Sequence, residues 1–145
     1  MGHYTKGDFN SVDNLAFSIG KARNLIQTQM DAALRGLNVK AAHVGTLMAL
    51  LDGTSTTSAA LSRHLGINTG LMTRMIDKLE ALGMVQRLRS HEDRRVVDLE
   101  LTEAGRAIAL RIAEIAPCVL NARLESFTKA EFDELCRLLD KFLGH

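Results

Sequence analysis

The chain has 145 residues, of which 46% are hydrophobic and 24% are charged, and its formal net charge is +1. These values are typical of one globular domain with its own core, and the small net charge by itself says nothing about nucleic acid. Two cysteines exclude a disulfide framework. No apolar run approaches the ~18 residues of a membrane span, and residues 1–10 are too polar for a secretory signal, so we expect a cytoplasmic protein without membrane contact.

The N-terminal part predicts a loose leader followed by two helices. Residues 1–10 have no apolar period. Between Val12 and Leu37 apolar residues recur every three or four positions, which indicates a long amphipathic helix. Gly36 is expected to end it, and Asn38 is expected to cap a second helix that runs through residue 51.

Two short helices follow, separated by a tight turn. The first covers residues 58–64, after a short polar bridge, and the second runs from the cap Asn68 to Leu82. A turn that contains a glycine, here Gly66, joins them. This arrangement predicts a helix-turn-helix, whose second helix enters the major groove of DNA.

A change of period after Gly83 predicts a β-hairpin. Residues 84–89 and 96–101 are β-prone, and the linker between them is charged. A hairpin that directly follows a helix-turn-helix makes a winged helix. A long helix opens at Thr102, with Pro117 expected to kink or end it, and Thr128 caps a last helix with Glu131 as its capping-box partner.

The second helix of the helix-turn-helix has one apolar face and one face suited to DNA. An arginine can bind a guanine or a phosphate, a threonine can bind either, and a leucine can contact a thymine methyl group. An ordinary solvated surface helix is the alternative. The candidate DNA-binding residues on this helix are Thr69, Gly70, Leu71, Thr73, Arg74 and Lys78.

Positive charge is concentrated around the hairpin. Residues 61–95 hold seven basic and four acidic residues. Arg89, Arg94 and Arg95 lie on or near the wing, where an arginine can enter the narrow minor groove. Asp93 is expected to hold the Arg95 guanidinium by a bidentate ion pair, although a solvated turn is the alternative.

Four runs resemble the multiple-antibiotic-resistance regulator (MarR) family: LSRHLGI at 61–67, MTRMIDKLEALGMV at 72–85, HEDRR at 91–95 and LTEAGR at 101–106. The resemblance covers nearly the whole chain and implies a dimer in which residues 69–82 read the major groove. It also implies that Asp93 and Arg95 form the family's wing motif, with Arg95 in the minor groove. Gly70 departs from the hydroxyl residue that the family often has near this position.

The expected fold is mainly α with a small β-hairpin wing. A single domain, 1–145, would hold a winged helix-turn-helix lobe at 39–103 between terminal dimerisation helices at 12–37 and 104–143. These helices are too apolar on one face to stay solvated, which favours a homodimer over a monomer. Two-fold pairing places two reading helices about 34–36 Å apart and predicts a pseudo-palindromic double-stranded operator.

The resemblance further implies a small effector, of the aromatic-acid or phenolic class, that releases a repressor from DNA. The residues expected near its crevice are Phe17, Arg23, His43 and Leu47, and a structural role for His43 is the alternative. Redox sensing through Cys118 or Cys136 is a second alternative, with Cys136 expected to be buried.

Other function classes have little support in the sequence. There is no phosphate-binding loop, nucleophile elbow, zinc-protease motif or cluster of carboxylates, so we expect no enzyme, catalytic residue or cofactor. The histidines are scattered without ligand spacing, which predicts no metal site. A winged helix that binds another protein in place of DNA remains as a rival.

Overall fold

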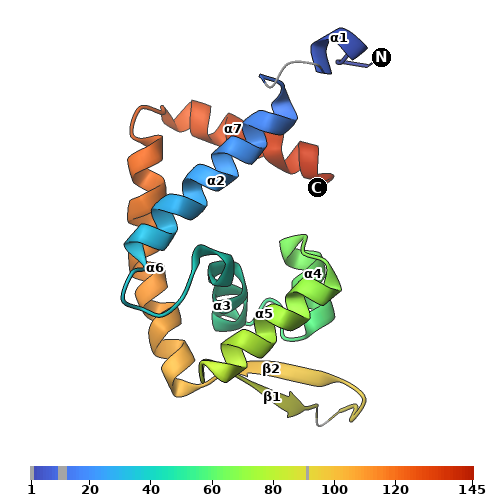
Figure 1. Cartoon of the computed structure of the whole chain (residues 1–145), viewed down its shortest axis with the longest axis vertical. Coiled ribbons are helices and arrows are strands. Elements are labelled where there is room, and N and C mark those ends of the chain that lie inside the picture. Colours follow the sequence, from blue (N-terminus) through green and yellow to red (C-terminus); the bar gives the residue numbers. More distant parts are fainter. Residues whose placement is uncertain (1, 10–12, 91) are drawn as a thin grey trace.

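The computed structural model describes residues 2–9, 13–90 and 92–145. It is mainly helical with one antiparallel hairpin, which confirms the expected fold class (Figure 1). The elements are α1 (Lys6–Phe9), α2 (Leu15–Ala33), α3 (Ala41–Asp52), α4 (Ser58–Leu65), α5 (Thr69–Ala81), β1 (Val85–Arg89), β2 (Val97–Leu101), α6 (Glu103–Leu124) and α7 (Lys129–Leu143).

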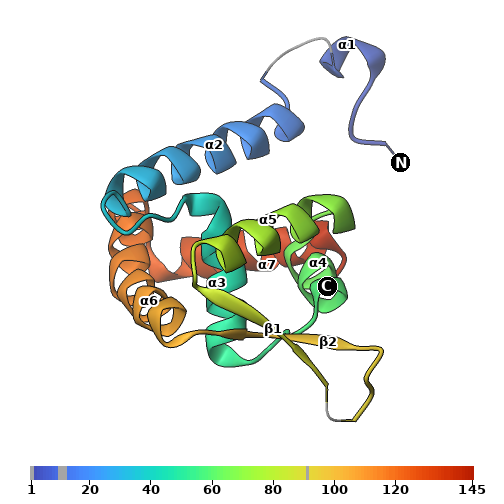
Figure 2. The ribbon, with the colours of Figure 1, turned by 60° about the horizontal axis from the view of Figure 1, so that its bottom comes forward.

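The molecule has two parts that α6 connects (Figure 1). α3, α4, α5 and the hairpin form a winged lobe at one end of α6, and α2 and α7 cross near its other end. The hairpin extends away from the helices (Figure 2). Among the described residues, no helix has both the length and the apolar character that a membrane span requires.

Side-chain caps fix where the helices of the winged lobe begin. The Oδ1 of Asn68 accepts from the backbone N–H of Leu71 at 2.8 Å, and the Oγ1 of Thr57 accepts from that of Ala60 at 3.1 Å. Such caps satisfy N–H groups that have no partner inside the helix. The prediction that Asn68 caps the second helix of the helix-turn-helix, α5, is therefore confirmed.

The capping box of α7 is confirmed as well. The backbone N–H of Glu131 donates to Thr128 Oγ1 at 3.2 Å, and the Glu131 carboxylate accepts from the backbone N–H of Thr128 at 2.8 Å. These reciprocal bonds turn the chain sharply after α6, so that α7 runs back across α2 (Figure 1).

The prediction for the N-terminus is wrong. Residues 6–9 form one turn of helix, α1, where a loose leader was expected. The Tyr4 hydroxyl accepts from the backbone N–H of Leu15 at 2.8 Å, and its ring meets Phe9 edge to face at 6.4 Å between centroids. These contacts attach α1 to the start of α2. Val12, the expected start of the first long helix, lies outside the described residues.

The turn between α2 and α3 also differs from the prediction. α2 ends at Ala33, about one turn before residue 37, and both Gly36 and Asn38 have left-handed backbone conformations, with φ of 93° and 59°. Asn38 does not cap α3. Asp31 Oδ1 instead accepts from the backbone N–H of Ala41 at 2.6 Å, so the cap comes from the neighbouring helix.

α6 does not end at Pro117 but continues to Leu124. Proline removes one donor and leaves the carbonyl of Ala113, four residues earlier, without its helical partner. Both residues are exposed, so water can satisfy that carbonyl and the helix tolerates the interruption.

The hydrophobic core lies in the winged lobe and against the first half of α6. The hairpin pairs Val85 with Leu101 and Arg89 with Val97, and the N–H of Leu99 donates to Thr56 O at 2.7 Å, which ties β2 to the bridge before α4. The largest fully buried side chains include Leu34, Leu47, Leu61, Met72, Ile76, Leu79, Val85 and Ile112.

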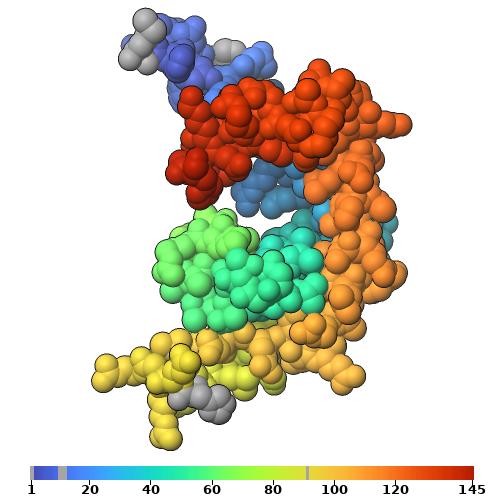
Figure 3. Space-filling view, turned by 180° about the vertical axis from the view of Figure 1, so that it is seen from behind, coloured from blue at the N-terminus to red at the C-terminus, as the bar shows by residue number. Residues whose placement is uncertain are grey.

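α7 is different, because none of its residues is buried in the single chain. Its apolar face, Phe132, Leu135, Leu138, Leu139 and Phe142, is 37–63% exposed. Together with Leu15 and Ile19 of α2, four of these residues line an apolar groove. A space-filling view shows a hollow between α7 and the winged lobe (Figure 3). The groove of α2 and α7 is therefore an apolar surface that no other described part of the chain covers.

Candidate nucleic-acid interface

α5 has the two faces that its sequence predicts. Met72, Ile76 and Leu79 are at most 1% exposed and anchor the helix on the core. The rest of the helix surface is exposed and includes the six residues of α5 that are proposed to meet DNA, namely Thr69, Gly70, Leu71, Thr73, Arg74 and Lys78. The structure therefore brings these six residues together on one helix.

The surroundings of Thr73 and Gly70 show what each of these two positions can offer to DNA. The Thr73 hydroxyl donates to the carbonyl of Thr69 at 2.9 Å, which leaves its oxygen lone pairs for an outside donor. A Cβ added at Gly70 would meet only Asn68 Oδ1, at 3.6 Å, an ordinary contact. The backbone therefore does not require glycine at position 70.

Arg87 connects the wing to α5. Its NH2 donates to Asp77 at 2.6 Å and its NH1 donates to Glu80 at 2.7 Å. The hydrogen bond that Arg87 donates to Asp77, aided by Glu80, raises the already high pKa of this guanidinium. Arg87 counts among the basic residues of this region, but its side chain is used to fix β1 against α5 and is not available to a phosphate.

The wing loop does not contain the ion pair expected between Asp93 and the guanidinium of Arg95. Asp93 Oδ1 accepts from the backbone N–H of Arg95 at 2.9 Å, and not from its guanidinium. Asp93 therefore shapes the turn, a common role of aspartate. Within the described residues, Arg89, Arg94 and Arg95 are exposed and form no ion pair. His91 lies outside the described residues.

The joint between the wing and α6 is tight. The N–H and hydroxyl of Thr102 donate to the carbonyls of Met84, at 3.0 Å, and Gly83, at 2.6 Å. A Cβ added at Gly105 would lie 1.8 Å from the Met84 carbonyl oxygen. The sequence motif contained this glycine, but only the fold shows that it lets α6 approach the strand.

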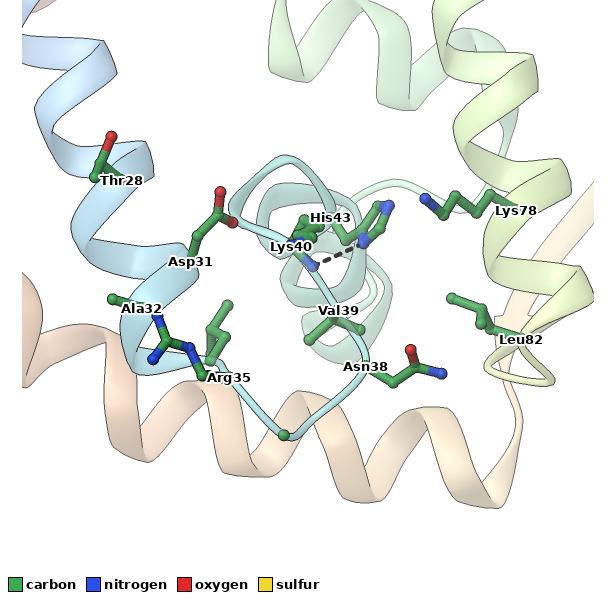
Figure 4. A pocket seen from close by; sticks show the side chains of 12 residues that line it. Thr28, Asp31, Ala32, Arg35, Asn38, Val39, Lys40, His43, Lys78 and Leu82 are labelled. Carbon is green, nitrogen blue, oxygen red and sulfur yellow. Dashed lines mark hydrogen bonds between the residues drawn. The ribbon is translucent and has the colours of Figure 1, made fainter.

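The four residues expected around an effector do not come together. Phe17 and Arg23 are exposed on α2, whereas Leu47 is completely buried in the core. Only His43 lines the cavity between α2, α3 and α5 (Figure 4). Leu47 faces the core of the lobe, and residues 17 and 23 lie on the other part of the molecule, so their placement near an effector stays a prediction.

The cavity measures about 480 Å³ and carries several charged groups, among them Asp31, Arg35, Lys40 and Lys78. His43 is 5% exposed, and its Nδ1 accepts from the backbone N–H of Lys40 at 3.0 Å. Burial lowers the pKa of His43, and Lys78 and Lys40 lower it further, whereas Asp31 opposes them. The imidazole is therefore neutral at pH 7.

Both cysteines are exposed, so the expected burial of Cys136 is wrong. Cys136 lies on α7, none of whose residues is buried by the part of the chain that the structure describes. The thiol of Cys118 donates to the carbonyl of Glu114 at 3.7 Å. Among the described residues, no group of three or more His, Cys, Asp or Glu side chains is placed to hold a metal ion.

Comparisons with known proteins agree with this geometry. A model of the MarR family matches residues 41–97, which span α3 to the start of β2. The multiple antibiotic resistance protein MarR of Escherichia coli is 28% identical over 135 residues, covering 90% of this chain and 94% of the relative. An HTH-type transcriptional repressor of Mycobacterium tuberculosis is 30% identical over 128 residues, covering 88% and 91%.

Solved structures show the same architecture over almost the full length. A variant of E. coli MarR in complex with operator DNA has a TM-score of 0.81 and 26% identity, over 93% of this chain and 97% of that one. The transcriptional regulator BldR from Sulfolobus solfataricus has a TM-score of 0.79 and 26% identity, over 97% and 98%.

Proposed function

This chain belongs to the MarR family of DNA-binding transcriptional regulators, and we propose that it is a repressor that binds a pseudo-palindromic operator as a homodimer. The observation that carries the proposal is the exposed face of α5, which lies beside a wing whose Arg89, Arg94 and Arg95 form no ion pair among the described residues. A repressor would act by occupying DNA that the polymerase needs.

The proposed contacts divide by groove. On α5, Arg74 and Thr73 would reach base edges or phosphates of the major groove, and Leu71, 44% exposed, would pack on a thymine methyl group. On the wing, Arg95 would enter the minor groove, and Arg94 and Arg89 would contact phosphates. Asp93 supports Arg95 through the backbone of the turn.

The dimer proposal rests on the uncovered apolar faces. α7 has an apolar stripe but no buried residue, and α2 buries only Met30. A second copy is the simplest cover, because one apolar patch can then bury its own equivalent around a two-fold axis. The same axis would present two copies of α5 to successive major grooves about 34–36 Å apart.

Arg95→Ala is expected to weaken operator binding by about 1–3 kcal/mol, or roughly 5- to 150-fold, because the arginine would lose its place in the negative potential of the minor groove. Fluorescence anisotropy with DNA from upstream of the protein's own gene, measured at several salt concentrations, checks this. The slope of log affinity against log salt should also decrease in magnitude.

Arg123→Ala is the matched control, because Arg123 is also exposed but lies near the α7 end of α6, far from the wing. The affinity of the Arg123→Ala variant for operator DNA should equal that of the wild type. Equal affinities for the Arg95 and Arg123 variants would remove the wing from the interface. Binding without any salt dependence in the wild type would favour the rival function, in which the winged helix meets another protein.

We further propose that a small effector, of the aromatic-acid or phenolic class, releases the repressor. The chain has a cavity of about 480 Å³ whose walls come from both α2 and the winged lobe. A ligand that fits only one arrangement of these two parts would change the spacing of the two α5 helices in the dimer and so favour the DNA-free state.

A further inference from the structure

The wing packs against the rest of the molecule only near its base. Leu99 is buried, and its N–H donates to Thr56 O at 2.7 Å. Further out, Leu88 and Val97 are 42% and 43% exposed, and the hydrogen bonds described for residues 89–97 stay within the hairpin. The hairpin extends away from the helices here (Figure 2). Packing alone therefore holds the outer wing only weakly at a given angle.

Arg87 is the last residue of β1 for which the structure describes an ion pair to α5. Its guanidinium donates to Asp77 at 2.6 Å and to Glu80 at 2.7 Å through separate nitrogens, so one planar group bridges two carboxylates one helical turn apart. The fork of an arginine fixes direction as well as distance. On β2, Asp98 accepts from the Thr56 hydroxyl at 3.4 Å, a long contact that does not reach α5.

A small change of angle at Arg87 moves the wing loop by several ångströms. A strand rises about 3.3 Å per residue, so the loop that holds Arg95 lies roughly 15 Å beyond Arg87, and a rotation of about 10° displaces it by roughly 2–3 Å. A hydrogen bond tolerates only a few tenths of an ångström. The contact between Arg95 and a groove therefore depends on the angle that Arg87 holds.

We propose that Arg87 is a positioning residue for DNA binding. Its bridge to Asp77 and Glu80 holds the wing at the angle that places Arg95 in the minor groove while α5 lies in the major groove. The bridge thus sets the spacing between contacts that come from two different elements. The proposal rests on the proposed function, because it requires that α5 and the wing bind one duplex.

Charge neutralisation is the rival role for Arg87. Asp77 and Glu80 lie on the helix that would read DNA, and Arg87 offsets one of their two negative charges. Both roles predict weaker operator binding for Arg87→Met. They differ for the double variant Asp77→Ala, Glu80→Ala, which loses two negative charges. Neutralisation predicts tighter binding with the contribution of Arg95 intact, whereas positioning predicts that this contribution is lost.

The angle of the wing is measured first without DNA, by residual dipolar couplings of backbone N–H groups in the full-length protein. In the wild type, the couplings of α5 and of the wing should fit one common alignment tensor. In Arg87→Met, and in Asp77→Ala, Glu80→Ala, the couplings of the wing should no longer fit the tensor of α5. A wing that keeps its wild-type couplings in both variants would overturn the proposal.

Operator affinity then shows whether the angle acts through Arg95. In the Arg87→Met background the further change Arg95→Ala should cost at most about threefold, because most of the contribution of Arg95 is already lost. Arg74→Ala, on α5, should cost the same factor in both backgrounds. A mere loss of stability would leave both costs unchanged, so the asymmetry is specific to positioning. An undiminished cost of Arg95→Ala would overturn the proposal.

The variant without the two carboxylates decides between the roles. Positioning predicts that Arg95→Ala costs at most about threefold in the Asp77→Ala, Glu80→Ala background as well. The full cost there, together with tighter binding overall, would establish neutralisation and overturn positioning.

Arg111→Met is the matched control. Arg111 donates to Glu114 at 2.7 Å, the same distance as from Arg87 to Glu80, but both residues belong to α6, so the pair joins no two elements. This variant should keep the wild-type wing couplings and the full cost of Arg95→Ala. The same changes as in Arg87→Met would overturn the proposal, because they would follow from the loss of any arginine pair.

Failure of this proposal is distinguishable from failure of the proposed function. A wild-type protein that binds no operator would refute the proposed function, whereas the couplings would still show whether Arg87 holds the wing. Operator binding that Arg95→Ala leaves unchanged in the wild-type background would remove the wing contact and, with it, the role of Arg87 in DNA binding.

Discussion

Replacing Gly105 by alanine is expected to lower the free energy of unfolding by about 3 kcal/mol or more. The added Cβ would lie 1.8 Å from the carbonyl oxygen of Met84 and 2.7 Å from its carbonyl carbon, both backbone atoms. No side chain can move aside to relieve this overlap, so α6 must shift away from β1. The shift would break the hydrogen bonds that Thr102 makes to Gly83 and Met84.

Urea denaturation followed by circular dichroism measures this loss as a lower midpoint with an unchanged slope. Gly70→Ala is the matched control, since Gly70 also lies in the first turn of a helix but has only Asn68 Oδ1 nearby. Alanine there should be neutral or stabilise the protein by about 0.5–1 kcal/mol, because glycine is a poor helix former. Similar midpoints for the two variants would contradict the close packing of α6 against the wing.

Leu139→Glu is expected to dissociate the proposed dimer and to lower operator affinity by roughly 100-fold or more. Leu139 is 42% exposed in the single chain and lies in the apolar groove of α2 and α7. A carboxylate at this position would be desolvated twice, once in each protomer, at a cost of several kcal/mol. A monomer presents a single α5 and would bind only one half of the operator.

Analytical ultracentrifugation measures the association state, and anisotropy measures the affinity for DNA. Leu88→Glu is the control, because Leu88 has the same 42% exposure but lies on the wing. This control should remain a dimer. A dimeric Leu139→Glu variant that binds the operator normally would exclude α7 from the dimer interface.

The sequence predicted best those elements whose signals are local. Asn68 and Thr128 cap their helices as predicted, because a cap depends on residues only three positions away. The apolar stripe of Met72, Ile76 and Leu79 likewise identified the buried face of α5. The order of helices and strands, and with it the winged-helix fold, followed from such signals.

The errors arose where residues distant in sequence decide the outcome. Asp31 caps α3 from the neighbouring helix, so the local candidate Asn38 was wrong. Arg87 contributes to the positive charge counted over residues 61–95, but it pairs with Asp77 and Glu80 across the junction of helix and strand. The residues in these two contacts do not stand at a sequence spacing that predicts a cap or an ion pair. The sequence likewise could not show that only His43 of the four expected effector residues lines the described cavity, since a cavity depends on how two parts of the chain meet.

The contact between α2 and α6 has a consequence for the order in which the chain folds during synthesis. α2 leaves the ribosome first, but residues 34–102 must follow before its partner α6 begins to emerge. Meanwhile the elements from α3 to β2 are neighbours in sequence and can assemble earlier, because local contacts form fastest.

We therefore expect the winged lobe to become ordered before α2 is protected. Hydrogen exchange on ribosome-stalled chains can measure this, since α2 should exchange freely when the chain has emerged from the ribosome as far as residue 102 and more slowly when α6 has emerged through Leu124. The uncovered face of α7 emerges last of all. A new chain would thus acquire its surface for DNA before it acquires its surface for a second copy.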